Sequence, residues 1–393
     1  MQLPPSVFSQ ITAVLFPVEF SRCSRRFPTR RAIRGLTVYD HFLALCFGQL
    51  TYRESLRDIV ACLQAKQPLL YHLGFRGRLT RTNLAYANEH RDWRMFEAAA
   101  QILMRRAARL YQSESPMDDF PNVAFALDAS IISLGLNLFP WGYYARTGKA
   151  ALKLHLMLSL QGNLPAWAAL TEASFPDMKA LERIPIVTGA YYIMDRGYLD
   201  FTRLIKLHEA NAFFVVRNKR HVKFRVHQSR PVDKSVGLRC DQTIRLTSTW
   251  SLKSYKHYLR RVKVYDPENR TTLVLLTNQF ELPALVIAEL YRRRWKVELF
   301  FKWIKQHLRL RSFYGRSENA VRCQIWSAVC AYLMVAIVKK QVKSGKTLNE
   351  NLQIISVHIF EQTKLYQLLA TKTMREAQEN KEDQHQNMFK FNS

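Results

Sequence analysis

Three acidic residues stand at places where folding could bring carboxylates together. Asp128 ends a stretch that alternates apolar residues with alanines, and Asp195 closes the short apolar run 191–194. Both patterns predict β-strands of a sheet. Glu298 lies in a later stretch that is predicted to be helical. Gathered carboxylates are the hard oxygen ligands that Mg²⁺ demands, so metal-assisted phosphodiester chemistry is the first use to consider.

The predicted helix around Glu298 presents a polar stripe. At about 100° of turn per residue, four polar residues share one narrow face: Tyr291, Arg294, Glu298 and Lys305. Their side chains could therefore point toward one target. The alternative is an amphipathic helix with a solvated charged face, and helical spacing alone does not distinguish the two.

The chain carries a large positive charge. Its 393 residues include 59 Lys and Arg against 31 Asp and Glu, a formal net charge of +28 at pH 7, and 48% are hydrophobic. This apolar share supports a sizeable core and excludes a disordered polycation. A folded protein tolerates such self-repulsion when a polyanion neutralises it, so the charge points to nucleic acid as the partner.

Cysteine usage and the length of the apolar runs indicate the cellular compartment. The six cysteines form no CxxC pair and have no histidine at ligand spacing, which argues against a zinc site or a disulfide framework. The N-terminus has no basic segment before its apolar stretch, and the longest apolar run, 325–338, is shorter than the ~20 residues that cross a bilayer. We therefore expect reduced thiols, no membrane partner and a cytoplasmic location.

The N-terminal part, up to about residue 118, is predicted to be helical and basic. Apolar residues recur every three to four positions over 36–50 and 52–63, and Thr80 is a suitable N-cap for a third helix. Because arginine and asparagine suit guanine and adenine edges, a DNA-reading helix-turn-helix is one interpretation. A helical bundle with solvated charges is the other. The DNA-binding candidates are Arg81, Asn83, Asn88 and Arg91.

From about residue 120 the hydrophobic period changes from 3.6 to 2. The order over 123–216 is three strands, helix, strand, helix, strand, which predicts a mixed α/β sheet. Residues 217–263 alternate as β-hairpins do and hold fourteen Lys and Arg against two acidic residues. The remaining predicted elements are a strand over 271–277, one long helix over 283–310, helices over 318–340 and 348–370, and a polar tail over 376–393.

Taken together, these residues resemble a known family. Asp128, then Asp195 in the string Asp-Arg-Gly-Tyr, then the helix signature Tyr-x2-Arg-x3-Glu-x6-Lys after a basic β-rich segment are similar to the DDE transposases of bacterial insertion sequences in the IS-four family. The likeness covers about residues 120–340, and about the first 70 residues resemble the helical DNA-binding segment of part of that family. The helix signature is the specific motif, because it fixes four identities and three spacings.

The resemblance implies an α/β protein with an RNase H-like mixed-sheet catalytic core, a β-rich insertion and an N-terminal all-helical DNA-binding domain. The expected division is a helical DNA-binding domain over 1–118, the first part of the core over 119–217, the basic insertion over 218–270, the second part of the core with the glutamate-bearing helix over 271–345, and a C-terminal helix and polar tail over 346–393.

The resemblance also implies the chemistry. Two Mg²⁺ ions, for which Mn²⁺ can substitute, would be held by Asp128, Asp195 and Glu298. The implied reaction is cut-and-paste transposition: nicking at the terminal inverted repeats, a hairpin intermediate, and strand transfer into target DNA. Double-stranded DNA, a homodimer in the paired-end complex and a nucleoid-associated location follow from the same likeness. The expected contacts to DNA phosphates and strand are Tyr291, Arg294 and Lys305.

An aromatic ring could serve the hairpin step. A hairpinned DNA end strains its terminal base pair, and stacking an extruded base on a ring would relieve that strain. Trp250 is the candidate, because it lies in the basic segment. Trp295 is the competitor, with core packing as its expected role. His155 is expected on the sheet surface, outside the site.

Two other functions fit parts of the sequence. An RNase H-like nuclease or resolvase would share the carboxylates but has little use for the basic segment. A non-catalytic DNA-binding relic of a transposase would fit the charge, although every expected catalytic position is filled. The inverted-repeat sequence, the target-site preference and the dimer surface have no signature in the chain.

Overall fold

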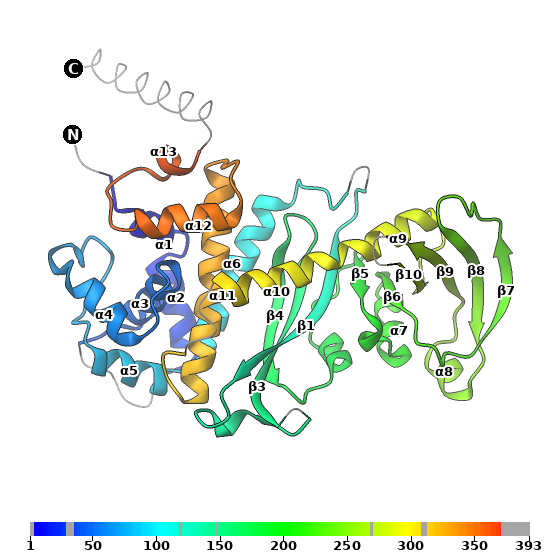
Figure 1. Cartoon of the computed structure of the whole chain (residues 1–393), viewed down its shortest axis with the longest axis horizontal. Helices are drawn as coiled ribbons and strands as arrows, with labels where there is room; N and C mark the ends of the chain where they lie inside the picture. The colour runs from blue at the N-terminus through cyan, green and yellow to red at the C-terminus, as the bar shows by residue number, and fades with distance from the viewer. Residues whose placement is uncertain are drawn as a thin grey trace, which may run out of the picture. The chain divides into compact units, whose positions relative to one another are not determined.

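The computed structural model describes residues 4–28, 35–117, 120–146, 148–267, 270–307 and 313–370. The predicted polar tail over 376–393 lies outside the described residues. The chain divides into two compact units. The helical unit comprises Met1–Leu110 and Trp303–Ser393, and the sheet unit comprises Tyr111–Lys302 (Figure 1).

Five strands form the centre of the sheet unit. β1 (Ala124–Leu134) pairs antiparallel with β3 (Lys149–Ser159), and β3 pairs antiparallel with β4 (Leu164–Glu172). On its other side β1 runs parallel to β5 (Tyr191–Met194), which runs parallel to β6 (Phe213–Arg217). The order β4-β3-β1-β5-β6 is the RNase H-like arrangement. The predicted fold class is therefore confirmed.

The basic segment continues this same sheet. β7 (Phe224–Arg230), β8 (Leu238–Leu246) and β9 (Leu259–Asp266) pair antiparallel in chain order, with α8 (Thr249–Ser254) between the last two. β10 (Thr271–Thr277) then joins β9 to β6. Together with the short β2 (Tyr143–Tyr144) on β3, these strands make a ten-stranded sheet. Figure 1 shows the later strands in darker green, beyond β6.

Two of the predicted elements in the sheet unit differ in the structure. The first four residues of β1 are all buried, so this strand is covered on both faces and does not alternate as predicted. The helix predicted between the third and fourth strands is a 3-10 helix over Asp177–Glu182. Pro176 and Pro185 flank it, and proline restricts the preceding residue to extended backbone.

The single helix predicted over 283–310 is two helices. α9 (Ala284–Arg293) and α10 (Trp295–His307) meet at Arg294. The Arg294 amide donates to the carbonyl of Tyr291 at 3.1 Å, a three-residue spacing typical of a 3-10 turn. This tighter turn changes which residues share a face, so the angles calculated for one continuous helix do not hold across it.

A buried ion pair fixes the segment that leads into α9. Arg260 is 3% exposed, and its Nε and Nη2 donate to Asp241 on β8 at 2.8 Å each. Its Nη1 donates to the carbonyls of Phe280 (3.3 Å) and Leu282 (2.5 Å). A charge so deep needs these partners, because an unpaired buried charge is strongly destabilising. The pair thereby ties β8 and β9 to the start of α9, which packs on β5 and β6.

The helical unit surrounds one long apolar helix. α11 (Glu318–Gln341) packs against α1, α3, α5 and α12. By length and composition α11 could cross a membrane, but its most apolar window is entirely buried inside the protein. Its apolar character is therefore accounted for by its place in the core. The other helices of this unit are α1 (Val7–Thr12), α2 (Pro17–Arg25), α3 (Val38–Leu50), α4 (Leu56–Gln64), α5 (Arg81–His90), α6 (Arg94–Tyr111), which ends one residue beyond the unit, α12 (Leu348–Val357) and α13 (Leu365–Leu369).

Candidate active site

The two strand aspartates lie side by side. β1 and β5 are parallel neighbours, and their register pairs Leu127 with Met194, the residues directly before Asp128 and Asp195. Neighbouring strands lie about 4.8 Å apart, so the two aspartates follow adjacent positions at one edge of the pairing. Asp195 ends its strand and accepts a hydrogen bond at Oδ1 from the Gly197 amide at 2.8 Å.

Arg294 links the strand aspartate to the helix glutamate. Its Nη1 donates to Asp128 Oδ2 at 2.7 Å, and its Nη2 donates to Glu298 Oε1 at 2.6 Å. The guanidinium therefore lies between carboxylates that are 170 residues apart in sequence. The break between α9 and α10 falls on this arginine, and Glu298 follows one turn later on α10.

Burial and charge perturb the groups around this bridge. Burial raises the pKa of Asp128 to about 6, which Arg294 opposes and the carboxylates of Asp195 and Glu298 reinforce. Burial alone would lower the pKa of Arg294, but Asp128 and the other neighbours raise it. Perturbed groups gathered in this way are typical of functional sites.

The other two residues of the helix signature, Tyr291 and Lys305, belong to different units. Tyr291 is 6% exposed, and the Arg294 guanidinium carbon lies 5.9 Å from its ring centre. Burial raises the pKa of the Tyr291 hydroxyl. Lys305 lies two turns beyond Glu298 on α10, in the part of the helix that belongs to the helical unit. Burial lowers the pKa of Lys305.

Two further features belong to this site, and the first is the tyrosine of the Asp-Arg-Gly-Tyr string. Tyr198 is buried, and its hydroxyl pKa is raised by burial and then by Asp128, Asp177 and Asp195. A pocket of about 660 Å³ also adjoins the site and shares Tyr291 and Arg294 with it. Its other basic lining residues are Arg217, Arg292, Arg293 and Lys296, and its acidic ones are Asp266 and Glu289.

Comparison with known protein families assigns the chain. A transposase DDE domain matches residues 119–334, more than half of the sequence. This chain belongs to that family. A second match, to a domain of unknown function (DUF4372), covers residues 4–76.

Individual transposases agree with this assignment. A transposase of Sinorhizobium fredii is 37% identical over 193 residues, which is 48% of this chain and 54% of that protein. The transposase of insertion sequence element IS5377 of Geobacillus stearothermophilus is 30% identical, over 60% of this chain and 62% of that protein. The chain therefore spans between about half and two thirds of the length of these relatives. The predicted resemblance to bacterial insertion-sequence DDE transposases is confirmed.

A solved structure also matches, that of a piggyBac transposase synaptic complex with hairpin DNA. The TM-score is 0.39 at 12% identity, over 95% of this chain and 80% of that chain. The fold assignment rests on the strand order of the sheet.

DDE transposase domains generally use divalent metal ions, and the residues here fit such an ion in chemistry. Asp128, Asp195 and Glu298 offer hard oxygen ligands, and a positive group already lies between two of them. The Arg294 Nε is buried without a hydrogen-bond partner, so this guanidinium is not fully satisfied where it lies. Among the described residues, no group of three or more His, Cys, Asp or Glu side chains is arranged to hold a metal ion.

Two of the four N-terminal DNA-binding candidates are wrong. Asn88 is 1% exposed, and its Oδ1 lies 2.7 Å from His41 Nε2. Arg91 is 3% exposed and donates to the carbonyls of Leu36 and Thr37. Both side chains hold the helical unit together and cannot reach DNA. Arg81 is exposed and Asn83 is half-buried, so these two candidates stay predictions.

The tryptophans and His155 differ from expectation in exposure. Trp250 on α8 is 61% exposed, as a stacking ring must be. Trp295 is 58% exposed and lines the basic pocket, so its predicted core packing is wrong. The helix break at Arg294 accounts for this, because it alters the face of the next residue. His155 is 1% exposed and contacts Thr171 Oγ1 at 2.9 Å, so it is buried rather than on the sheet surface.

Proposed function

We propose that this protein is a DNA transposase that cuts and joins DNA at the ends of its own insertion sequence. The observation that carries the proposal is the Arg294 bridge between Asp128 and Glu298, beside Asp195 and next to a basic pocket. A basic pocket beside carboxylates suits a phosphodiester that reacts between them. Membership of the DDE family supports the same reaction class.

Asp128, Asp195 and Glu298 are the residues that would hold the metal, as two Mg²⁺ ions. When bound, such ions activate the attacking oxygen and stabilise the leaving oxygen of a phosphodiester. Arg294 has to release at least one carboxylate for this, since it now occupies their facing oxygens.

Released from the carboxylates, Arg294 can donate two parallel hydrogen bonds to a DNA phosphate, which its planar guanidinium suits. Tyr291 packs beside it and limits where the guanidinium can turn. Arg217 and Lys296 line the adjoining pocket and would neutralise the next phosphates along the strand. Lys305 would act as a further point charge on DNA.

The reaction sequence we propose begins with hydrolysis of one strand at a terminal inverted repeat, which frees a 3′-OH. That oxygen then attacks a phosphodiester of the opposite strand and displaces the flanking DNA, which forms a hairpin. Water hydrolyses the hairpin bond and regenerates the 3′-OH, which then attacks a target phosphodiester and displaces a 3′-OH of the target strand. Two ends must be cut together, so we expect the protein to act as a homodimer on double-stranded DNA. A nucleoid-associated location follows from that substrate.

A plasmid assay tests this function. Supercoiled plasmid carrying the DNA that flanks this reading frame is incubated with the full chain, with Mg²⁺ or with excess EDTA. We expect Mg²⁺-dependent nicks at the ends, lost in Asp195→Asn and retained in Asp233→Asn, which changes an exposed aspartate of the same unit. Nicks spread over the plasmid would instead indicate a nuclease or resolvase, and end binding without cleavage would indicate a relic.

The hairpin step needs its own measurement. End-labelled products are separated on denaturing gels for Trp250→Ala and Trp295→Ala. If Trp250 receives the extruded base, its variant keeps first-strand nicking and loses the hairpin. An unchanged hairpin yield rejects Trp250, and a loss confined to Trp295→Ala assigns the stacking to the ring in the basic pocket.

A further inference from the structure

A lysine of the sheet unit is buried close to the candidate active site. The side chain of Lys153 on β3 is only 12% exposed, and its Nζ donates to the carbonyl of Phe175 at 2.7 Å and to Asp177 Oδ1 at 3.0 Å. A charge so deep needs such partners, because an unpaired buried charge is strongly destabilising. The ion pair therefore fixes Asp177, the first residue of the 3-10 helix over Asp177–Glu182, against β3.

The second oxygen of Asp177 faces the turn that follows Asp195. A Cβ added at Gly197 would lie 3.8 Å from Asp177 Oδ2 and 3.0 Å from Asp195 Oδ1. Both oxygens thus lie within 4 Å of one point, beside a residue that has no side chain. The Gly197 amide donates to the same Asp195 oxygen at 2.8 Å. Asp177 is therefore a close neighbour of the Asp195 carboxylate, and Lys153 holds it there.

The charges of both aspartates act on the same buried hydroxyl. Tyr198 is 2% exposed and lies at the end of the short turn that Asp195 begins. Burial is the main cause of the raised pKa of its hydroxyl, and Asp128, Asp177 and Asp195 raise that pKa further. Asp177 therefore acts electrostatically on the same space as the two strand aspartates.

The charge of Asp177 is only partly available to this space. Lys153 occupies one of its oxygens, so the ion pair as a whole decides how much negative charge is felt beside Asp195. Among the described residues, Asp195 forms no ion pair, which leaves its carboxylate open to the field of a neighbour. A carboxylate that lies near a divalent ion without holding it still strengthens binding of that ion, because charges interact strongly where water is partly excluded.

We propose that the Lys153–Asp177 pair sets the affinity of the metal centre for its divalent ion. Asp177 acts as a positioning residue, which adds negative charge beside Asp195 without holding the ion, and Lys153 limits that charge. The inference rests on the proposed function, because it concerns the site formed by Asp128, Asp195 and Glu298. It gives the buried pair a role beyond joining β3 to the 3-10 helix.

Mn²⁺ binding to the full chain, measured by electron paramagnetic resonance of the free ion, tests this without any catalytic step. Asp177→Asn removes a negative charge and keeps the shape, so we expect Mn²⁺ to bind about five-fold more weakly. Lys153→Met removes the opposing positive charge and keeps an apolar stem, so we expect binding about five-fold tighter. The double variant should bind within about two-fold of wild type, because the two charges that it removes oppose each other.

The matched controls are Lys149→Met, which removes an exposed lysine of the same strand, and Asp233→Asn, which removes an exposed aspartate of the same unit. Each should change Mn²⁺ affinity by less than about two-fold, because exposed charges are screened. Melting temperatures report the stability of every variant. If Lys153→Met does not fold, the double variant compared with Asp177→Asn gives the effect of the lysine.

A pair that serves stability alone would lower the melting temperature of both single variants without moving Mn²⁺ affinity in opposite directions. That result overturns the inference, and so does a shift of the same sign in both. If Asp195→Asn abolishes Mn²⁺ binding while the variants of the pair bind like wild type, only the inference fails. If Asp195→Asn binds Mn²⁺ as tightly as wild type does, the proposed metal site fails with it.

Discussion

Arg294 supplies the positive charge between Asp128 and Glu298, and this pairing gives one residue two incompatible tasks. It cannot bridge the carboxylates and donate to a DNA phosphate with the same two nitrogens. The raised pKa of Asp128, about 6, shows that burial is incompletely offset by the bridge. Under the proposed function, a metal cation would compete with the arginine for the same oxygens.

Replacing Arg294 should move metal affinity and catalysis in opposite directions. Arg294→Gln frees the carboxylates, so we expect Mn²⁺ to bind several-fold more tightly, as measured by electron paramagnetic resonance of the free ion. The same change removes a phosphate donor, and we expect end nicking to fall about 100-fold. Lys296→Gln loses an equal charge nearby without touching the carboxylates and should leave Mn²⁺ affinity unchanged. An Arg294→Gln protein that binds Mn²⁺ no better than wild type would contradict the competition.

The residue types of this site could be predicted from the sequence, and their pairing could not. Strand patterns located Asp128 and Asp195, and helical spacing placed Arg294 and Glu298 together. That Arg294 turns toward Asp128 depends on a contact across 166 residues, which no local pattern encodes. The prediction that Arg91 contacts DNA was wrong for the same reason. Arg91 is buried because it donates hydrogen bonds to the carbonyls of Leu36 and Thr37, which are distant in sequence.

Among the elements, strands were predicted better than helix continuity. The strand over Thr271–Thr277 lies where it was predicted, because a short run rich in threonine, valine and leucine suits a strand of a sheet. The break at Arg294 has no proline or glycine to announce it, so the helix over 283–310 was predicted as continuous. The unexpected exposure of Trp295 follows from that break. Packing between elements decided both the helix break and the exposure of Trp295, and hydrophobic periodicity does not report such packing.

The contact between α3 and α5 predicts a pH dependence of stability. His41 is fully buried beside Asn88, and burial, with Arg91, lowers its pKa to about 3. The unfolded chain binds this proton near pH 6.5 and the folded chain does not, so stability is complete above pH 6.5 and falls as pH drops toward 3. The free energy of unfolding of the helical unit, measured in urea, should fall by about 2–3 kcal/mol between pH 7 and pH 4.5 because of this group.

Two histidine variants separate this contribution from other titrations. His41→Gln removes the group and should shrink the loss, whereas His72→Gln changes an exposed histidine of the same unit and should leave it as it was. An imidazole of His41 that titrates near pH 6.5 in nuclear magnetic resonance spectra would contradict the assignment.

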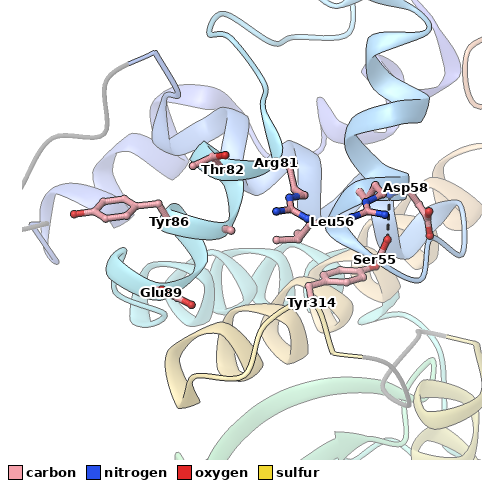
Figure 2. Close-up of a pocket in the computed structure, with 10 residues that line it drawn as sticks. Ser55, Leu56, Asp58, Arg81, Thr82, Tyr86, Glu89 and Tyr314 are labelled. Atoms are coloured by element: carbon pink, nitrogen blue, oxygen red, sulfur yellow. Dashed lines mark hydrogen bonds between the residues drawn. The ribbon is translucent and has the colours of Figure 1, made fainter. Parts of the chain in front are cut away.

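At the scale of the whole molecule, the charge of +28 is divided between surfaces in both compact units. The sheet unit has the basic pocket beside Arg294, and the helical unit has exposed arginines such as Arg57 and Arg81, the second of which Figure 2 shows at the start of α5. Sequence reasoning does not separate these surfaces, because charge counts do not say which arginines are already paired. Arg260, for example, is buried against Asp241 and contributes nothing to a DNA surface.

The net charge of +28 predicts a steep salt dependence of DNA binding. Each neutralised phosphate contributes about −0.9 to the slope of log K against log salt, so six or more contacts over both surfaces would weaken binding at least about 1,000-fold between 50 and 200 mM KCl. Anisotropy titrations of the full chain measure this slope, and melting temperatures over the same range show that salt does not unfold the protein. A slope near −2 would mean that only about two phosphates are neutralised. A flat response would mean that the excess charge serves some other partner.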